Sequence, residues 1–401
     1  MTRLKRVLLY LYAFSSFFQA QFLTINLHSF RLSIGRVLLL VFAIGLLLRI
    51  GRSIVIPDDY LYRFLVILFF YQFINIINGL RFGIGKWLFL TYLVAIYYVL
   101  GMTLKKIDKN ADFFKKILVA SNLGILIQVG IGLFEHFTGI YLWTSSAELF
   151  STVIYFKNMK FPCAMQENPN DFAFLMIVGM LVSAILLLKT KSIITKVFLT
   201  CIMGCEVYLI YVAGSRGVLL GLILAIVYIL SSEFFFKRNH TSKQIIITVL
   251  ILTAFLMIFV LHFDKFIGEL TSHLDFSGGN SVRKGLIVQG INSLLQTLGL
   301  GYGVHGIAAW HNHFIEILAE FGIIIFVLFL RFYYELFKRS KIVADRFPEE
   351  RSICLLIRGF LLSLVFCFVS PASILNIEWY GFVVVMIIAF LSYYSKEVEI
   401  I

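Results

Sequence analysis

Long apolar stretches alternate with short polar segments along most of the chain. Twelve of these stretches have about 17–24 residues, enough for a helix to cross a hydrocarbon core about 30 Å thick. Because lipid satisfies no backbone N–H or C=O group, each stretch is predicted to be helical. The pattern therefore predicts an all-α integral membrane protein that forms a single polytopic domain over residues 1–401. The twelve spans are expected at about 7–25, 34–50, 60–78, 84–102, 113–136, 170–188, 194–213, 217–236, 244–262, 312–331, 352–371 and 378–395.

Composition also favours a membrane protein. Hydrophobic residues make up 60% of the chain and charged residues 14%, whereas soluble domains have about 45–50% and about 25%. The five cysteines show no disulfide framework and no zinc-ligand spacing. The first span follows a basic start and lacks a small-residue cleavage site, so we expect it to remain in the protein.

The distribution of basic residues predicts the orientation of the spans. With the N-terminus in the cytoplasm, 24 of the 35 Lys and Arg residues fall in cytoplasmic segments, 10 fall in outer segments, and Arg358 lies within a span. This bias follows the positive-inside rule and places both termini in the cytoplasm. The net charge of +13 is therefore a topology signal, and nucleic acid is excluded as a partner.

Two predicted outer segments are longer than a simple connection requires. They cover about 137–169 and about 263–311. A loop of about fifty residues inside a compact protein is unusual unless it has a function. Within the second segment, "SVRKGLIVQGINSLLQTLGLG" (Ser281 to Gly301) is predicted to form a short amphipathic helix along the membrane surface.

Three cations on the predicted outer side are candidate ligands for an anion. Arg216 lies in "YVAGSRGVLLG", a tight turn that has no structural need for a guanidinium. It either reaches lipid headgroups or binds a phosphate, whose oxygens match its planar fork. Arg283 and Lys284 lie in the large outer loop, where the competing interpretations are an ordinary exposed residue and a headgroup contact.

Polar residues gather at the mouth of the tenth span, in "WHNHFIEILAEFG". His311 is a candidate for proton transfer, because imidazole titrates near working pH; the alternative is an ordinary interfacial histidine. His313 points to a different helix face and is expected to be structural. Asn312 and Glu316 are spaced for a hydrogen bond along the first turns, which favours a structural role.

Two further groups of polar residues precede predicted spans. In "CAMQENPNDFAFLM", Pro169 and Asp171 mark a helix start with Asn168 or Asn170 as its cap, and lining of a cavity is the alternative. Tyr302, in the glycine-rich approach to the tenth span, is a candidate for substrate binding.

The residues that metal or nucleotide chemistry requires do not appear on the predicted outer side. The outer segments have no D-x-D and no paired carboxylates that would hold a catalytic divalent cation. The chain has no Walker A sequence and no G-x-S-x-G elbow. Neither a metal nor another cofactor is therefore predicted.

Four short motifs occur in a characteristic order along the chain. They are "FEHFTGIYLW" (Phe134 to Trp143), "ENPND" before the sixth span, "AGSRG" in the seventh–eighth hairpin and "HNHFIEILAEFG" at the tenth span. In the order and shared outward placement of these motifs, the chain resembles the O-antigen ligase and polysaccharide polymerase superfamily. The resemblance implies a glycosyltransferase fold of the GT-C type with a large outer loop between the ninth and tenth helices.

The resemblance also implies roles for individual residues. Members of the superfamily transfer glycans carried on undecaprenyl pyrophosphate without a metal. Arg216 and Arg283 match the positions of family arginines that bind the pyrophosphate of the donor. His311 matches the position of a family histidine that binds or activates the acceptor. His313 is a departure from the family pattern. The candidate substrate-binding residues are Lys284, Asn312, Tyr302, Asn168 and Asn170.

The function expected from this resemblance is polymerisation of lipid-linked oligosaccharide repeat units into surface polysaccharide, on the outer leaflet of a bacterial cytoplasmic membrane. The alternative within the same chemistry is a ligase that moves the glycan to lipid A core, cell wall or protein. The alternative from another class is a lipid-glycan flippase, which should bury charges along its path. Expected partners are the undecaprenyl-pyrophosphate-linked donor, a glycan or lipid acceptor, membrane lipids, a flippase and a chain-length regulator.

Overall fold

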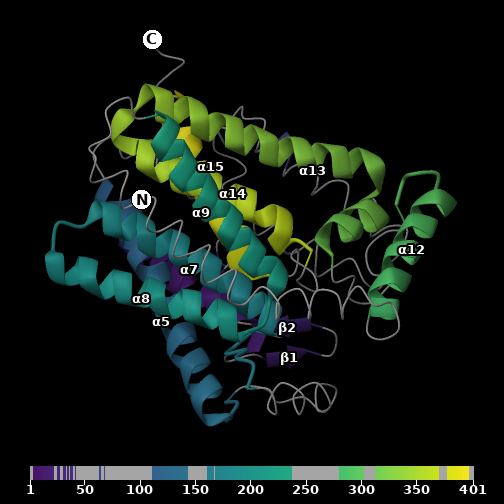
Figure 1. Ribbon diagram of the computed structural model, residues 1–401, viewed down its shortest axis with the longest axis horizontal. Helices are drawn as coiled ribbons and strands as arrows, with labels where there is room; N and C mark the ends of the chain where they lie inside the picture. Colours follow the sequence, from purple (N-terminus) through teal and green to yellow (C-terminus); the bar gives the residue numbers. More distant parts are fainter. Residues whose placement is uncertain are drawn as a thin grey trace.

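The computed structural model is a bundle of helices (Figure 1). It describes residues 3–21, 111–142, 160–236, 280–301, 312–369 and 377–396, apart from residue 167, together with short pieces between 25 and 67. The 3-10 helices are η1 (Ser16–Gln21) and η3 (Pro348–Glu350), and the strands are β1 (Ile25–Leu27) and β2 (Phe30–Leu32). The α-helices are α1 (Arg3–Ser15), α5 (Ala111–Thr138), α7 (Pro169–Lys189), α8 (Ile193–Val212), α9 (Arg216–Phe236), α12 (Asn280–Gln296), α13 (His313–Arg346), α14 (Arg351–Cys367) and α15 (Glu378–Lys396).

Seven predicted spans coincide with helices of the structure. These helices are α5, α7, α8, α9, α13, α14 and α15. Among the described residues, α5, α7, α8 and α13 are long and apolar enough to cross a membrane. With 21 residues, α7 is about 31 Å long, which matches a hydrocarbon core. The spans predicted at 34–50, 60–78, 84–102 and 244–262 fall largely outside the described residues.

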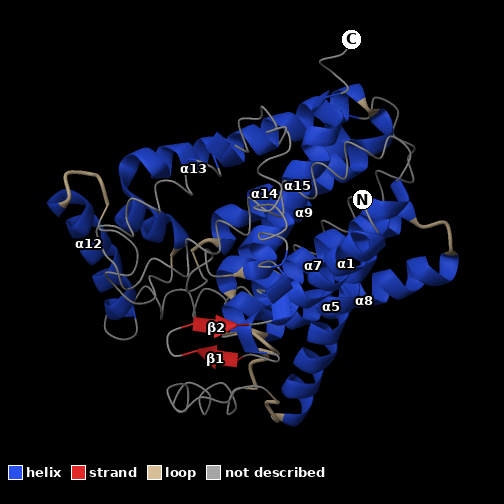
Figure 2. Ribbon diagram, turned by 180° about the vertical axis from the view of Figure 1, so that it is seen from behind, coloured by secondary structure: helices blue, strands red, loops and turns tan. Residues whose placement is uncertain are grey.

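The N-terminal region differs from the single helix predicted over 7–25. The α-helix ends at Ser15 and continues as the 3-10 helix η1 to Gln21. The hydroxyl of Ser15 donates to the Tyr12 carbonyl and that of Ser16 to the Ala13 carbonyl, so they compete with the helical backbone bonds. The following strands β1 and β2 form a small antiparallel hairpin, with Ile25 opposite Leu32 (Figure 2). This hairpin is an exception to the all-α prediction.

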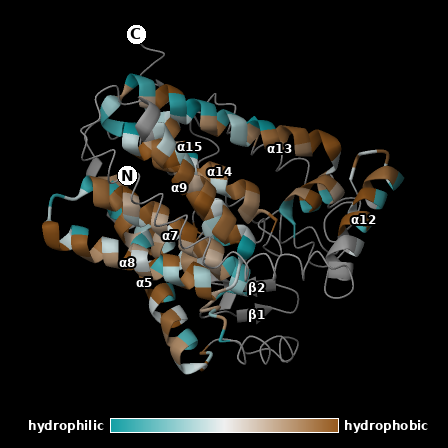
Figure 3. Cartoon of the chain, viewed as in Figure 1, coloured by the Kyte–Doolittle hydropathy of each residue, from teal (hydrophilic) through white to brown (hydrophobic). Residues whose placement is uncertain are grey.

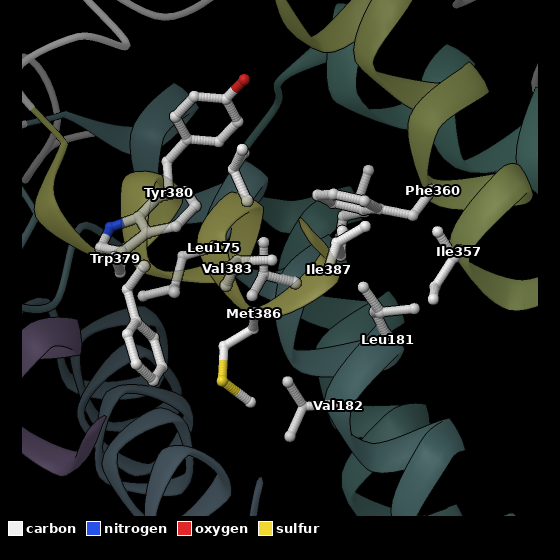
Figure 4. Packing of buried hydrophobic residues seen from close by; sticks show 14 of the residues in the cluster. Leu175, Leu181, Val182, Ile357, Phe360, Trp379, Tyr380, Val383, Met386 and Ile387 are labelled. Atoms are coloured by element: carbon white, nitrogen blue, oxygen red, sulfur yellow. The ribbon is translucent and has the colours of Figure 1, made fainter. Parts of the chain in front are cut away.

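Helix α15 forms the centre of the bundle. Every residue from Trp379 to Ser392 is buried. Its apolar side chains, among them Trp379, Val383 and Met386, pack between those of α7 and α14 (Figure 4). A helix that is apolar on all sides must be enclosed by protein or lipid. Here the enclosing surfaces are other helices.

The crossing of α9 and α14 depends on small residues. A Cβ atom added at Gly221 would lie 2.6 Å from the carbonyl oxygen of Ser363 and 3.0 Å from the sulfur of Cys367. A Cβ added at Gly359 of α14 would lie 2.8 Å from Ile229. Small residues let helix backbones approach closely in membranes, where no hydrophobic force drives helices together.

Much of the length of the helices is apolar (Figure 3), and many of these apolar side chains are exposed. On α8, seven large apolar side chains are more than one third exposed: Ile193, Ile194, Val197, Phe198, Val207, Tyr208 and Tyr211. An exposed apolar face of this size on a soluble protein would favour aggregation. On a membrane protein it is the surface that contacts lipid.

Replacement of Gly221 by alanine is expected to destabilise the fold by about 1–3 kcal/mol, because the added methyl group must displace the Ser363 carbonyl or the Cys367 thiol. Thermal melting of the purified protein in detergent measures the change. Gly204→Ala on α8 is the matched control, since open space surrounds that position. Equal melting of the two variants would contradict a tight α9–α14 contact.

Candidate functional site

The predicted tight turn before Arg216 is confirmed. Helix α8 ends at Val212 and α9 begins at Arg216 itself. Gly214 has a φ of 68°, a left-handed conformation that glycine adopts without strain. A Cβ there would also lie 3.2 Å from the ring of Phe161. The turn therefore requires glycine and fixes Arg216, which is half-buried, at the first residue of α9.

Of the two predicted caps of α7, Asn168 and Asn170, the structure uses Asn168. Its side-chain oxygen accepts a hydrogen bond from the Asp171 N–H at 3.0 Å, and its amide nitrogen donates to the Asp171 carboxylate at 2.6 Å. Pro169 occupies the first helical position, where a missing N–H costs nothing. Asn170 lies within the first turn and is half-buried. The capping interpretation of this motif is confirmed.

Asn312 caps α13 in the same manner. Its side-chain oxygen accepts a hydrogen bond from the Ile315 N–H at 3.2 Å. The predicted side-chain contact between Asn312 and Glu316 is replaced by another pair: the Glu316 carboxylate lies 2.9 Å from Nδ1 of His313. Asn312 thus has the structural role that the sequence favoured, through a backbone partner.

His313 faces the interior of the bundle. It is 1% exposed, and its ring centroid lies 5.3 Å from that of Phe329 and 4.9 Å from that of Phe368. Its backbone N–H donates to the Phe368 carbonyl at 2.7 Å. These contacts tie the start of α13 to the end of α14. They agree with the structural role predicted for His313; His311 lies outside the described residues.

A turn at residues 160–166 is built around the buried carboxylate of Glu135. One carboxylate oxygen of Glu135 accepts hydrogen bonds from the N–H groups of Cys163, at 2.8 Å, and Ala164, at 2.7 Å. Ala164 has a φ of 48°, which is unfavourable for a residue with a side chain. The tyrosine hydroxyl of Tyr141 donates to the carbonyl of Phe161. Glu135 therefore supports a strained turn whose Phe161 packs under Gly214.

Gln166 connects this turn to the rest of the bundle. Its amide nitrogen donates to the Phe17 carbonyl in η1, and its oxygen accepts from the indole N–H of Trp379, both at 3.1 Å. The side-chain oxygen of Gln128 accepts from the Met165 N–H at 3.0 Å. Three helices and η1 are thus joined through one short segment.

Contacts place several helix beginnings at one end of the bundle. Gly221, near the start of α9, approaches Cys367 at the end of α14. His313, at the start of α13, bonds to Phe368 at that same end. The ring of Phe368 packs 5.9 Å from that of Tyr380, at the start of α15. Together with the 160–166 turn, which leads into α7, these regions form what we call the site end.

The opposite end of the bundle has different contacts. The ammonium of Lys189, at the end of α7, lies 2.7 Å from the carboxylate of Glu350, just before α14. The rings of Phe347 and Tyr394 pack 5.0 Å apart at the ends of α13 and α15. Lys338, Lys341 and Arg346 are exposed there. We call this the basic end, which the basic-residue pattern predicts to be cytoplasmic.

Helix α12 is joined to α13 by a backbone contact between glycines. Helix α13 is broken at Gly322, which has φ 83° and ψ 176°. The N–H of Ile323 donates to the carbonyl of Gly299 at 2.9 Å instead of to its own helix. A Cβ at Gly301 would lie 2.5 Å from the nitrogen of Gly322. In both views α12 lies beside the first part of α13 (Figures 1 and 2).

The described structure therefore brings together only some of the predicted site residues. Arg216, Asn312, Asn168 and Asn170 lie at the site end, at the starts of three helices. Arg283 and Lys284 lie in α12. Tyr302 and His311 fall outside the described residues. The predicted helix within Ser281–Gly301 is confirmed, and its position along a membrane surface stays a prediction.

Glu135 and Gln166 were not identified as important from the sequence. Glu135 lies in "FEHFTG", at the end of an apolar span, and Gln166 lies beside "ENPND". The available signal was a polar side chain at the edge of an apolar stretch, since buried polar groups need hydrogen-bond partners. Those partners are backbone groups, which sequence patterns do not specify.

The described structure is that of a helical protein with membrane-length apolar helices and polar candidate residues gathered at helix starts. No family model matches the chain. The chain is similar to teichuronic acid biosynthesis protein TuaE of Bacillus subtilis (strain 168), with 24% identity over 328 residues. The match covers 74% of this chain and 64% of that protein, less than two thirds of its length. This distant similarity to a polysaccharide biosynthesis protein supports the broad family that the motifs resemble.

Replacing Glu135 by alanine is expected to open the 160–166 turn, because two buried N–H groups lose their acceptor at about 1–3 kcal/mol each. The readout is alkylation of Cys163 by a maleimide, followed by peptide mass spectrometry. Burial, and secondarily the carboxylates of Glu135 and Asp171, raises the pKa of the Cys163 thiol, so its reactive thiolate is scarce at neutral pH.

We therefore expect Cys163 to react slowly in the wild type and at least about tenfold faster in Glu135→Ala, since 1.4 kcal/mol of easier opening corresponds to about tenfold. Glu135→Gln keeps an acceptor oxygen and should change the rate less. Exposed Cys201 is the internal control and should react at the same rate in all three proteins. An unchanged Cys163 rate in Glu135→Ala would contradict the role of this carboxylate.

Proposed function

We propose that this protein is a membrane glycosyltransferase of polysaccharide biosynthesis, which joins oligosaccharide repeat units carried on undecaprenyl pyrophosphate. One observation carries the proposal: α7, α9 and α13 begin at the same end of the bundle, with Arg216 as the first residue of α9. Helix N-termini have partial positive charge and favour anions. The similarity to a teichuronic acid biosynthesis protein supports the class of substrate.

The proposed chemistry uses the pyrophosphate as leaving group. Negative charge builds up on the pyrophosphate as the bond between C1 of the sugar and its oxygen breaks. Arg216 and Arg283 stabilise this charge with in-plane N–H donors, in a site of low dielectric where such contacts are strongest. The reaction then proceeds without a metal.

His311 completes the proposed mechanism as a general base. It accepts the proton of the attacking sugar hydroxyl, a contribution of about 10²–10⁴-fold in rate. In the described structure Asn312 caps α13 and the backbone of His313 is bonded to Phe368. Asn312, which follows His311 in the chain, is thereby held at the site end.

Polymerase and ligase differ only in the acceptor. A polymerase transfers the growing chain to another lipid-linked repeat unit, and a ligase transfers it to a terminal lipid, cell-wall or protein acceptor. Purified protein in liposomes, given a lipid-pyrophosphate-linked repeat unit alone, separates the two. A ladder of longer lipid-linked chains supports a polymerase; transfer only after addition of a terminal acceptor supports a ligase.

One observation favours the transport alternative. Glu206 of α8 is fully buried, and within the part of the chain that the structure describes neither of its carboxylate oxygens has a hydrogen-bond partner. Its carboxylate packs against Gly179 of α7. Ionisable residues inside a membrane span often mark a transport path. Movement of the lipid-linked unit across a liposome membrane, without formation of longer chains, would support transport in place of glycosyl transfer.

Arg216→Lys is expected to lower turnover by about 10²-fold, because the charge stays but the fork of in-plane donors is lost. Activity is measured on the lipid-linked repeat unit without added metal or nucleotide. Arg346→Lys, an exposed change at the basic end, is the matched control and should keep full activity. Wild-type turnover of Arg216→Lys would instead make Arg216 a headgroup contact.

Direct displacement by the acceptor hydroxyl predicts inversion at C1 of the transferred sugar. We expect the new linkage to have the anomeric configuration opposite to that in the donor, as measured by NMR of the product. The same configuration in donor and product would require a covalent intermediate and would rule out this mechanism.

A further inference from the structure

Arg358 is a buried cation inside α14. The residue is 7% exposed, and its Nε donates to the carbonyl of Cys354, one turn earlier, at 3.4 Å. Among the described residues, no carboxylate pairs with it. Arginine has five N–H donors, and those on its two terminal nitrogens have no hydrogen-bond acceptor in the described parts of the chain. A charge of this kind in a membrane span is costly unless it is paired or reaches the membrane interface.

Aromatic rings from two other helices surround this guanidinium. Its central carbon lies 5.8 Å from the ring of Tyr228, in α9, and 6.0 Å from the ring of Phe337, in α13. Aromatic faces attract a cation. They do not satisfy N–H groups that point outward in the guanidinium plane. The rings therefore hold the side chain while its hydrogen-bonding edge remains available.

The guanidinium lies near the basic end of the bundle. Arg358 comes seven residues after Arg351, where α14 begins, which corresponds to about 10 Å along the helix. Helical side chains lean toward the N-terminus of their helix, and the bond to Cys354 follows this direction. The guanidinium therefore lies about one to two helical turns from the start of α14. Because the basic-residue pattern predicts that α14 begins at the cytoplasmic surface, we expect this position to lie near the lipid phosphates.

The surroundings at this level carry a net positive charge, because Lys338, Arg339, Lys341 and Arg346 of α13 outnumber its acidic residues there, Glu335 and Asp345. Lys338 and Lys341 of α13 are exposed, one and four residues beyond Phe337. The acidic residue Glu350 is held by Lys189 at 2.7 Å. Clusters of basic residues on the cytoplasmic side of membrane spans attract anionic lipids. Basic residues and a buried guanidinium at one level thus favour an anion from the membrane itself.

We propose that Arg358 binds the phosphate of an anionic phospholipid in the inner leaflet. Two in-plane N–H groups contact two phosphate oxygens. Tyr228 and Phe337 orient the guanidinium, and Lys338 and Lys341 attract the headgroup. The acyl chains run along the exposed apolar surface of α13 formed by Val327, Leu330 and Tyr334. This site lies at the basic end, away from the site end, and does not depend on the proposed glycosyl transfer.

The test is native mass spectrometry of the full-length protein titrated with phosphatidylglycerol or, separately, with zwitterionic phosphatidylcholine. The wild type is expected to retain one phosphatidylglycerol more tightly than any phosphatidylcholine. Arg358→Gln should weaken that binding at least about tenfold, the scale of a lost charge-assisted contact. Arg346→Gln, an exposed change at the basic end outside the proposed lipid site, also removes one positive charge and serves as the matched control, with a change of less than about threefold.

Two further measurements distinguish loss of the lipid site from misfolding of the variant and from binding of a different ligand. Arg358→Lys keeps the charge and should bind phosphatidylglycerol more weakly than the wild type; phosphatidylglycerol should raise the melting temperature of the wild type more than that of this variant. Wild-type binding of phosphatidylglycerol by Arg358→Lys, or equal binding by Arg358→Gln and Arg346→Gln, would overturn the proposal. Displacement of the lipid by millimolar inorganic phosphate would overturn the lipid assignment and indicate a site for free phosphate.

Discussion

Backbone polar groups at the ends of membrane helices must find partners inside the protein, and the site end depends on how this chain meets that constraint. Asn168 and Asn312 supply acceptors for the first turns of α7 and α13. Glu135 supplies one for the strained 160–166 turn, and Gln166 joins that turn to Trp379. Each of these side chains bonds to a backbone group or to a residue distant in the chain. As a result, the described starts of these helices are joined to one another by hydrogen bonds within the protein.

Glycines complete this arrangement where no side chain fits. Gly214 lets the chain reverse over Phe161 directly before Arg216. Gly322 breaks α13, and the N–H group freed by the break is satisfied by Gly299. A broken helix is tolerated at membrane depth only where its backbone groups find such partners. The break therefore attaches α12 to α13. Arg283 and Lys284 of α12 are thereby linked to the helix that begins at His313.

The sequence predicts where most of the helices lie, but it does not predict most of the hydrogen bonds and ring contacts that join them. Apolar length alone locates α5, α7, α8, α9, α13, α14 and α15, because the requirement for about 20 apolar residues is strong. The cap at Asn168 is also predictable, since N-caps have a local signature. The pairing of His313 with Glu316, in place of Asn312 with Glu316, depends on Phe329 and Phe368 burying the imidazole. Such contacts, like those of Glu135, come from distant segments and leave no periodic pattern in the sequence.

The bonding of the carboxylates also determines the electrostatic character of the site end. Glu135 bonds to two backbone N–H groups, Asp171 to the amide of Asn168 and Glu316 to His313. Carboxylates bonded in this way have their negative charge offset by local donors. The positive ends of α7, α9 and α13 and the guanidinium of Arg216 are then opposed by few uncompensated negative charges. An end of the bundle that keeps its acids occupied internally favours an anionic ligand, and this selection follows from the same hydrogen bonds that hold the helices in place.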